Sequence, residues 1–453
     1  MEQPDWHGPL TEAYEQATRF LTGLPSRPVG SGAGPDELRA ALGGPLPGKG
    51  TDAREVIARL AAAADAGIVA SPSGRFFGFV IGGATPAALA ADWLTATWDQ
   101  NAGLYAAGPS AAVVEEVAGG WLRDLFGLPA HTSVGFVTGA QMSHVTALAA
   151  ARHEVLRRAG WDVEAGGLHG APRITVVAGA DRHSTIDRAL RFLGIGTAAL
   201  VPVDVDDQGR MQPDALRTAL DDIDGPVIVC AQLGNVNTGA CDPIAAICDI
   251  AHASGAWVHV DGAFGLWAAA SSRHRHLVTG VDRADSWTTD AHKWLNVPYD
   301  SGLVFCAHPQ AHRAAMGVRA AYLVHAGGDE RDALDHNPEF SRRARGFPVY
   351  AALRTLGRDG VEALIDRTCE LATRFATRMG DAVLNEVVLN QVLLTFGPQT
   401  FDLITRVREE GTCWVSGTTW QGSPAMRFSV SNHTTDESDI DRAAEVILRL
   451  AAS

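Results

Sequence analysis

The sequence has few of the features that mark a secreted or membrane-spanning protein. Only six of its 453 residues are cysteines, and no two of them form a Cys-x-x-Cys pair. Small buried thiols explain such cysteines better than disulfides or a zinc site. No secretory leader is visible in MEQPDWHGPL, and no apolar stretch reaches the length that spans a bilayer. We therefore expect a cytoplasmic protein without a metal site.

Positive charge is also scarce. The chain carries 37 basic and 52 acidic residues, which gives a net charge of −15 with histidine neutral. This balance argues against nucleic acid or an anionic membrane surface as the main partner. The composition, 46% hydrophobic and 20% charged, is otherwise that of an ordinary soluble protein. The net charge says nothing about the charge of a small substrate.

Two glycine-rich stretches resemble nucleotide-binding loops but lack essential parts of them. In GGPLPGKG, residues 43–50, Gly50 stands where a phosphate loop needs serine or threonine, and two prolines remove amide donors. GSGAGP, residues 30–35, lacks the strand-to-helix context of a dinucleotide-binding fingerprint. We interpret both stretches as connectors.

From about residue 76 onward, apolar β-rich runs alternate with helical patterns, which predicts an α/β fold with a largely parallel sheet. Parallel strands are covered on both faces, and the continuous apolar character of the runs fits that burial. The expected strands are GFVTGA, RITVVAGA, TAALVPVDV, GPVIVCAQLG, AWVHVDGA, DSWTTDAH and SGLVFCAH.

The pattern changes near residue 345 and divides the chain into three parts. Residues 1–75 contain two expected helices around a Pro/Gly-rich stretch, and residues 76–345 form the large α/β domain. Residues 346–453 begin with a long helical block, continue with the short strands NQVLLTFG, TCWVSGTTW and MRFSVSN, and end in a helix. We expect this last part to be a small α+β domain.

The turn Gly139-Ala140-Gln141 joins an apolar strand to a helix in FVTGAQMSHVTALAAAR. Small residues at such a turn let backbone N–H groups approach an anion at the helix N-terminus, where the helix dipole favours negative charge. Many strand-to-helix turns look like this and bind nothing, so the motif alone does not identify a site.

Two further polar residues follow apolar strands directly. Asp261 ends the strand of AWVHVDGAFGLW, where a buried carboxylate is costly unless it meets a cation. Ligands of open α/β sheets bind at this end of the strands, although an aspartate that caps a helix is an alternative. His183 follows RITVVAGA, and a lone histidine there is more often structural.

Lys293 lies where the strand-like part of DSWTTDAHKWL ends. Taken alone, it is most simply a surface lysine in a turn. Together with the anion-binding turn, His183 and Asp261, however, it completes a set. Pyridoxal 5′-phosphate needs a helix N-terminus for its phosphate, a carboxylate for its pyridinium N–H, a flat group over its ring and a lysine for a Schiff base. The combination predicts a pyridoxal 5′-phosphate site.

These motifs resemble the group II pyridoxal-phosphate-dependent amino-acid decarboxylases of fold type I. ADSWTTDAHKWL resembles the family's ADS-x-x-x-[DN]-x-HKW block, HVDGAFG its HVDAA segment, and EEVAGGWLRDLFGLP the approach to its phosphate loop. The resemblance runs from about FFGFVIGGATPAALAADWL to the C-terminus. It implies a mostly parallel seven-stranded sheet in a large domain, a small α+β C-terminal domain, and a homodimer with active sites at the interface.

The resemblance also assigns roles at the ring of the cofactor. Lys293 matches the lysine that forms the Schiff base, and His292 matches its neighbour beside the cofactor. Asp261 matches the carboxylate that pairs with the pyridinium nitrogen, and Ala263 lies close to the ring. His183 matches the histidine that stacks on the ring face.

At the phosphate end the match is less regular. Gly139 precedes Ala140 and Gln141, which match the phosphate-binding pair, and Gln141 replaces a more usual serine. Asp290 stands where the family often has an asparagine that contacts the phosphate. An acid at this position would repel a phosphate dianion.

The implied reaction is decarboxylation of an L-amino acid to the amine and CO₂ through the lysine Schiff base. Family members usually carry a mobile loop whose tyrosine returns a proton to Cα. Here no tyrosine occurs between Tyr322 and Tyr350. His325, His336 or His292 could donate the proton instead.

Three alternatives remain at this point. Family members without the loop tyrosine can direct the reaction to oxidative deamination, which gives an aldehyde. A fold-type-I aminotransferase or another lyase would share the lysine, the aspartate and the phosphate turn. A cofactor-binding protein that has lost catalysis would also keep these residues.

Overall fold

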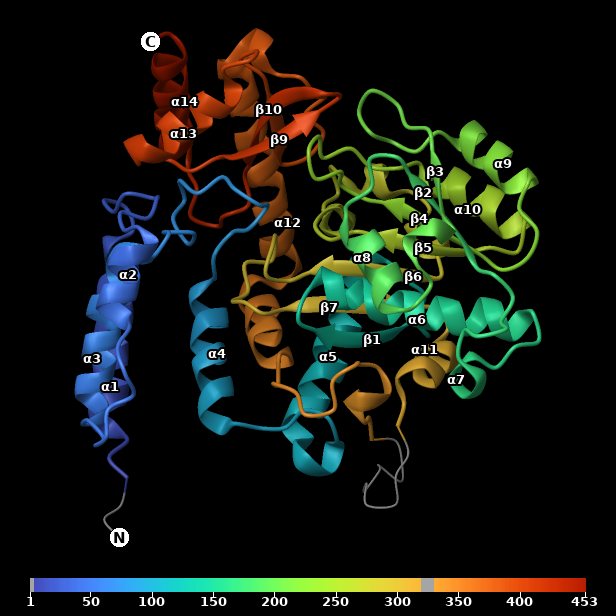
Figure 1. Cartoon of the computed structure of the whole chain (residues 1–453), viewed down its shortest axis with the longest axis horizontal. Helices are drawn as coiled ribbons and strands as arrows, with labels where there is room; N and C mark the ends of the chain where they lie inside the picture. The colour runs from blue at the N-terminus through green and yellow to red at the C-terminus, as the bar shows by residue number, and fades with distance from the viewer. Residues whose placement is uncertain (1–3, 319–329) are drawn as a thin grey trace.

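The fold is built around a seven-stranded sheet (Figure 1), and the computed structural model describes residues 4–318 and 330–453. The strand order is β1-β7-β6-β5-β4-β2-β3, and only β7 runs antiparallel to its neighbours. The predicted mostly parallel seven-stranded sheet is therefore confirmed, with one strand from each expected run. The strands are β1 (Ser133–Val137), β2 (Thr175–Gly179), β3 (Leu200–Val203), β4 (Val227–Gln232), β5 (Trp257–Asp261), β6 (Ser286–Asp290) and β7 (Gly302–Cys306).

Helices cover both faces of this sheet because its strands are apolar on both faces. Val176 and Ile228 pack with the helices of one face, whereas their neighbours Val177 and Val229 pack with those of the other. The first face carries α6 (Ala140–Arg158), α7 (Val163–Gly166), α8 (Thr185–Phe192) and α11 (Pro309–Met316), and the second carries α5 (Pro109–Phe126), α9 (Pro213–Asp221) and α10 (Ile244–Ala253).

A second, smaller sheet lies at the C-terminal end of the chain. It consists of β8 (Gln391–Leu394), β9 (Ser416–Trp420) and β10 (Ser423–Ser429), all antiparallel. It packs on α12 (Gly346–Met379), α13 (Thr400–Glu410) and α14 (Glu437–Ala451) around the stacked rings of Phe375 and Phe428. The long helix α12 also contacts α4 (Pro86–Trp98) and α5, so it links the two sheets.

The N-terminal helices α1 (His7–Gly23), α2 (Pro35–Leu42) and α3 (Ala53–Ala64) form a column beside the rest of the molecule (Figure 1). Helix α2 lies inside the stretch that the sequence suggested was a Pro/Gly-rich connector. Pro35 occupies its first turn and the Glu37 side chain accepts a hydrogen bond from Gly34 N–H, which are standard helix-start features. Among the described residues, no helix is both long and apolar enough to cross a membrane.

Asp285 lies just before β6 and fixes the amino end of that strand. Its carboxylate accepts a hydrogen bond from Val258 N–H at 2.7 Å and lies 2.7 Å from His308 Nε2 and 3.1 Å from His252 Nε2. Burial works to raise the pKa of Asp285, but these partners outweigh it and lower the pKa to about 2.

We expect Asp285→Asn to lower the free energy of unfolding by about 2–3 kcal/mol at pH 6, the value of a pKa lowered from 3.8 to about 2. Because a lowered carboxyl pKa stabilises only above the unfolded pKa, the difference between variant and parent should shrink as pH falls from about 4 toward 2. Urea unfolding from pH 7 to pH 3 measures it, with the exposed Asp36→Asn as control. A difference that does not change with pH would contradict this.

Candidate active site

The polar residues predicted from the strand ends surround one cavity of about 140 Å³. Five of the nine predicted cofactor-site residues line it. Gly139, Asp290 and His292 contact these five or each other, and the Gln141 side chain bonds to Thr185. The carboxyl ends of parallel strands meet at one edge of a sheet, which explains why residues distant in sequence converge there. The five lining residues are Ala140, His183, Asp261, Ala263 and Lys293.

Lys293 lies in a short turn between β6 and β7, and its Nζ is 3.1 Å from Asp290 Oδ2. Asn296 holds this turn in a left-handed conformation (φ 57°), which asparagine tolerates better than most residues. Asn296 Nδ2 donates to Ser431 O at 2.9 Å, and Trp294 Nε1 donates to Thr368 Oγ1 on α12 at 2.8 Å. Contacts with the segment that follows β10 and with α12 therefore fix the backbone that carries the lysine.

Lysine is rare in this chain, which contains only Lys49 and Lys293. Lys49 is exposed in the connector before α3, whereas the side chain of Lys293 is 21% exposed and faces the cavity. Lys293 is thus the one lysine of the sequence at the cavity.

Asp261 is the last residue of β5 and is 6% exposed. Its Oδ1 accepts a hydrogen bond from Ala263 N–H at 3.1 Å, and its Oδ2 lies 3.5 Å from His144 Nε2. Burial works to raise the pKa of this carboxyl, but the nearby His144, His183 and Lys293 outweigh it and hold the pKa below its ordinary value. Asp261 is therefore a carboxylate at neutral pH.

His183 lies between β2 and α8 and its ring is held by Thr185. His183 Nδ1 accepts a hydrogen bond from Thr185 N–H at 3.3 Å and lies 2.8 Å from Thr185 Oγ1. Burial lowers the pKa of His183, and the attraction of Asp261 opposes this only in part, so the ring is neutral at pH 7. Gln141 braces the same segment by donating to Thr185 O at 3.2 Å.

The N-terminus of α6 meets a carboxylate in this structure. Ala140 N–H donates to Asp290 Oδ1 at 2.7 Å, and Gly139 lies so close to His292 that a Cβ there would approach its Cε1 to 3.1 Å. The small residues of this turn thus allow the close approach that the sequence suggested. A phosphate at the same amide would meet the Asp290 charge, so a contact between Asp290 and phosphate stays a prediction.

The three candidate proton donors lie in different places. His292 is next to Lys293, and its Nδ1 accepts a hydrogen bond from Ser301 N–H, so the proton of the neutral ring is on Nε2. His336 packs against His312 with ring centroids 5.2 Å apart and is not among the residues that line the cavity. His325, like Tyr322, lies outside the described residues.

Arg427 of β10 also lines the cavity, and sequence reasoning did not identify it. It is 9% exposed, and no carboxylate of residues 4–318 or 330–453 lies within ion-pair distance of it. Its contacts are weak, with Ser416 Oγ and Val236 O each at 3.4 Å. Burial lowers its pKa. A lone arginine inside the apolar run MRFSVSN was the available signal.

Phe79 and Val80 form another part of the wall that the sequence did not reveal. Both have left-handed backbones, with φ 55° and 60°, which cost bulky residues free energy and tend to occur at functional sites. Phe79 is 54% exposed and its ring lies 5.1 Å from that of Trp414. The Phe79 ring therefore gives the cavity an aromatic wall.

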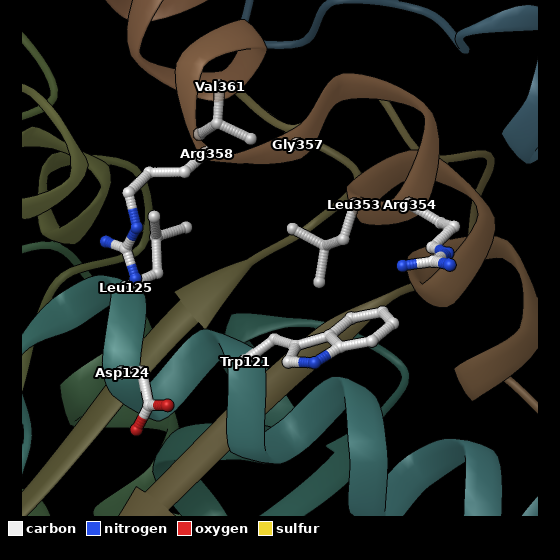
Figure 2. A pocket seen from close by; sticks show the side chains of 8 residues that line it. All are labelled: Trp121, Asp124, Leu125, Leu353, Arg354, Gly357, Arg358 and Val361. Carbon is white, nitrogen blue, oxygen red and sulfur yellow. The ribbon is translucent and has the colours of Figure 1, made fainter.

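A second hollow of about 240 Å³ lies between α5 and α12, next to the break in α12 at Gly357 (Figure 2). Trp121 and Leu353 face it, and Arg354 and Arg358 lie on either side. The predicted cofactor-site residues do not line this hollow, so it is separate from the candidate active site.

The groups around the first cavity fit pyridoxal 5′-phosphate. Lys293 supplies an amine, Asp261 a buried carboxylate, and His183 a neutral ring on the cavity wall. Gln141 Oε1 is buried without a hydrogen-bond partner among the described residues, but an amide oxygen only accepts, so it can meet a donor group and not a phosphate oxygen. Lys293 would hold the carbonyl carbon, Asp261 the ring nitrogen, and the α6 turn the phosphate.

Comparisons with known proteins agree with this arrangement. The pyridoxal-dependent decarboxylase conserved domain matches residues 35–395. An aromatic-L-amino-acid decarboxylase of Bacillus atrophaeus is 28% identical over 83% of this chain and 78% of its own. An L-2,4-diaminobutyrate decarboxylase of Rhizobium meliloti (strain 1021) is 32% identical over 70% of this chain and 65% of its own.

Solved structures show the same fold. A rice (Oryza sativa) protein, TDC, solved with PLP and tryptamine, superposes with a TM-score of 0.93 at 24% identity, over 100% of this chain and 99% of its own. The family match covers most of the sequence and includes Lys293, His183 and Asp261. The chain belongs to the pyridoxal-dependent decarboxylase family and is a pyridoxal 5′-phosphate-dependent amino-acid decarboxylase.

Proposed function

We propose that the chain converts an L-amino acid to its amine and CO₂ with Lys293 as the covalent anchor of the cofactor. The observation that carries this proposal is that Lys293, Asp261 and His183 all line one cavity. Bound there, pyridoxal 5′-phosphate supplies an electron sink for the pair of electrons that CO₂ leaves behind. The residues of the chain position the reacting groups and move protons.

Each residue has a distinct part in this proposal. Asp261, ionised at neutral pH, holds a proton on the ring nitrogen. His183 covers one face of the ring, because Thr185 fixes its imidazole at the cavity wall. His292 returns a proton to Cα only from its imidazolium form, because a neutral imidazole is too weak an acid, and in that form its Nδ1 gives up the hydrogen bond from Ser301 N–H.

We further propose that Arg427 binds the substrate carboxylate. It is a buried cation at the cavity without a carboxylate partner among the described residues, and such a group is costly unless an anion meets it. Arg427 comes from β10 of the small sheet, whereas His183, Asp261 and Lys293 follow strands of the large sheet, and all four line the same cavity.

Arg427→Gln is expected to raise KM by about 10–100-fold, the value of a hydrogen bond to a charged group, and to change kcat less. The reason is that this contact binds the substrate before reaction and is not gained in the transition state. Steady-state CO₂ release measures both constants. Arg408→Gln is the matched control, because Arg408 is half-buried against Trp414 and does not line this cavity. An unchanged KM in Arg427→Gln would remove Arg427 from the binding site.

One experiment can identify both the substrate and the product. The relatives named above act on aromatic and diamino substrates, so the holoenzyme should be screened with aromatic, acidic and basic L-amino acids. CO₂, amine, aldehyde and peroxide are measured in the same reaction. CO₂ with equimolar amine supports the proposal. Aldehyde and peroxide without amine would show oxidative deamination, and a keto acid without CO₂ would show an aminotransferase.

We propose a homodimer in which the N-terminal segment, residues 1–75, helps to join the two copies. Helices α1 and α3 pack on each other but expose large apolar side chains. Contact of such side chains with water is unfavourable, and exposed apolar patches often mark a protein–protein interface. Light scattering should give about twice the 47.8 kDa of one chain, and a monomer would overturn the proposal. The exposed residues include Leu10 (55%), Tyr14 (60%) and Leu60 (55%).

We also propose that the protein works in the cytoplasm. All six cysteines are free and buried, as expected of a chain that folds without disulfides in a reducing compartment. Localisation of a tagged copy by cell fractionation tests this directly.

A further inference from the structure

A chain of buried polar side chains leads away from Asp261. His144 Nε2 is 3.5 Å from Asp261 Oδ2, and His144 Nδ1 is 2.9 Å from His259 Nε2. His259 Nδ1 is 2.9 Å from Ser286 Oγ, which in turn accepts a hydrogen bond from Trp257 Nε1–H at 2.9 Å. The chain joins α6, β5 and β6.

These side chains are shielded from water. His144, His259, Ser286 and Trp257 are each 0% exposed. A buried polar group that lacks a partner is costly, so their protons must be arranged to satisfy one another. Burial, helped by the nearby His144, lowers the pKa of His259 to about 3, so His259 is neutral.

The indole N–H of Trp257 gives the chain a direction. An indole can only donate, so Ser286 Oγ must accept from it. The Ser286 hydroxyl proton then has His259 Nδ1 as its acceptor. If His259 Nδ1 carried a proton instead, the Ser286 hydroxyl proton would have no acceptor among its partners in the described residues.

The same logic continues to the carboxylate. With Nδ1 as acceptor, the proton of neutral His259 is on Nε2 and is donated to His144 Nδ1. The proton of neutral His144 is then on Nε2, which lies 3.5 Å from Asp261 Oδ2 and has no closer hydrogen-bond partner among the described residues, so Asp261 is the acceptor it faces. Every donor in this arrangement points toward Asp261, and each donor before His144 has an acceptor within 2.9 Å.

We propose that Trp257, Ser286, His259 and His144 form a one-directional hydrogen-bond relay that orients Asp261 and sets how strongly it holds a proton at the cofactor nitrogen. All four are positioning residues, because none of them lines the cavity. This inference rests on the proposed role of Asp261. The relay supplies a neutral donor, so Asp261 keeps its full charge for the cofactor.

The competing arrangement is an ion pair in which His144 is doubly protonated. Its positive charge would weaken the attraction of Asp261 for a proton on the cofactor nitrogen, because the carboxylate would already be neutralised. Lys293 and Arg427 also line this cavity, and the charge of Lys293 already favours the ionised form of Asp261. The two arrangements differ in where the protons lie and can be distinguished.

Neutron diffraction from deuterium-exchanged crystals of the holoenzyme locates these protons directly. The proposal requires deuterium on His259 Nε2 and on His144 Nε2, and none on His259 Nδ1 or His144 Nδ1. Deuterium on both nitrogens of His144, or on His259 Nδ1, would overturn it. This result does not depend on what Asp261 does for the cofactor.

Variants test whether the relay matters for the reaction. His144→Leu removes the last donor and is expected to lower kcat by about 10–100-fold. His144→Gln can place an amide N–H near the position of the imidazole Nε2 and should recover most of that loss. Ser286→Ala lies two side chains from Asp261 and is expected to lower kcat by about 2–10-fold.

Ser143→Ala is the matched control for these variants. Ser143 is also 0% exposed, precedes His144 on α6 and bonds to Thr288 and Leu303, but it is not part of the relay. Equal kcat values in Ser286→Ala and Ser143→Ala would contradict a role of the relay in the reaction. Equal losses of kcat in His144→Gln and His144→Leu would contradict it as well. If Asp261→Asn is fully active, the proposed role of Asp261 has failed while the neutron result still reports on the relay.

Discussion

Lys293→Ala is expected to lower the rate of CO₂ release by at least about 10⁴-fold. Loss of the group that binds the cofactor covalently removes the whole reaction path, whereas loss of one contact would only slow it. The visible absorbance that a lysine-bound pyridoxal 5′-phosphate gives should also disappear. Absorbance titration and CO₂ assay with a saturating amino acid measure the two effects. A variant with more than a tenth of the parent rate would exclude Lys293 as the anchor.

The scarcity of lysine in the chain leaves few alternative sites for the cofactor in this test. Since Lys49 is the sole other lysine of the sequence, Lys49→Ala is a complete control and should keep both absorbance and activity. Borohydride reduction of the holoenzyme followed by mass mapping has only these two side chains to label. A pyridoxyl group on Lys293 alone supports the proposal, and one on Lys49 would contradict it.

Asp261→Asn is expected to lower kcat by about 10²–10³-fold, the size of effect seen when a preorganised electrostatic partner of a transition state is removed. Asparagine keeps the shape of aspartate but not its charge, so it cannot hold a proton on the cofactor nitrogen. Burial of the side chain makes the charge more effective than it would be in water. Steady-state CO₂ release, with cofactor binding followed by absorbance, separates loss of rate from loss of cofactor.

Asp285→Asn is the control for the effect of Asp261→Asn on rate. Asp285 is an aspartate at the amino end of β6, the opposite edge of the sheet, and contacts His252 and His308. It should lose stability but keep kcat at pH 7. Similar kcat values in the two variants would show that any buried carboxylate of the sheet matters equally, and Asp261 would then have no special role.

The sequence predicted those parts of the fold that depend on local patterns. Each of the seven apolar runs forms a strand, because a short, continuously apolar segment is typical of a parallel strand that is buried on both faces. The strand ends then placed Asp261, His183 and Lys293 at one edge, since parallel strands share a direction. The helix α2 was missed because proline and glycine dominate the stretch around it.

Where residues from other parts of the chain meet the cavity could not be predicted from such local patterns, even though the lone arginine in MRFSVSN was visible in the sequence. Arg427 comes from the small sheet, and Phe79 precedes the large sheet by many residues, so their approach to the cavity depends on how the two sheets pack. His144 looked like one more polar residue of α6 until its distance from His259 was known. The rarity of lysine was present in the sequence and pointed to Lys293 without any structure.

The contacts of the turn that carries Lys293 bear on the heat inactivation of the enzyme. Its backbone is bonded to Ser431 through Asn296 and to α12 through Trp294, so it cannot open while either neighbour stays folded. Amide hydrogens in such a segment exchange with solvent only through large cooperative openings. Heat inactivation should therefore coincide with unfolding of the whole chain, without an earlier step in which a folded protein has lost its reactive lysine.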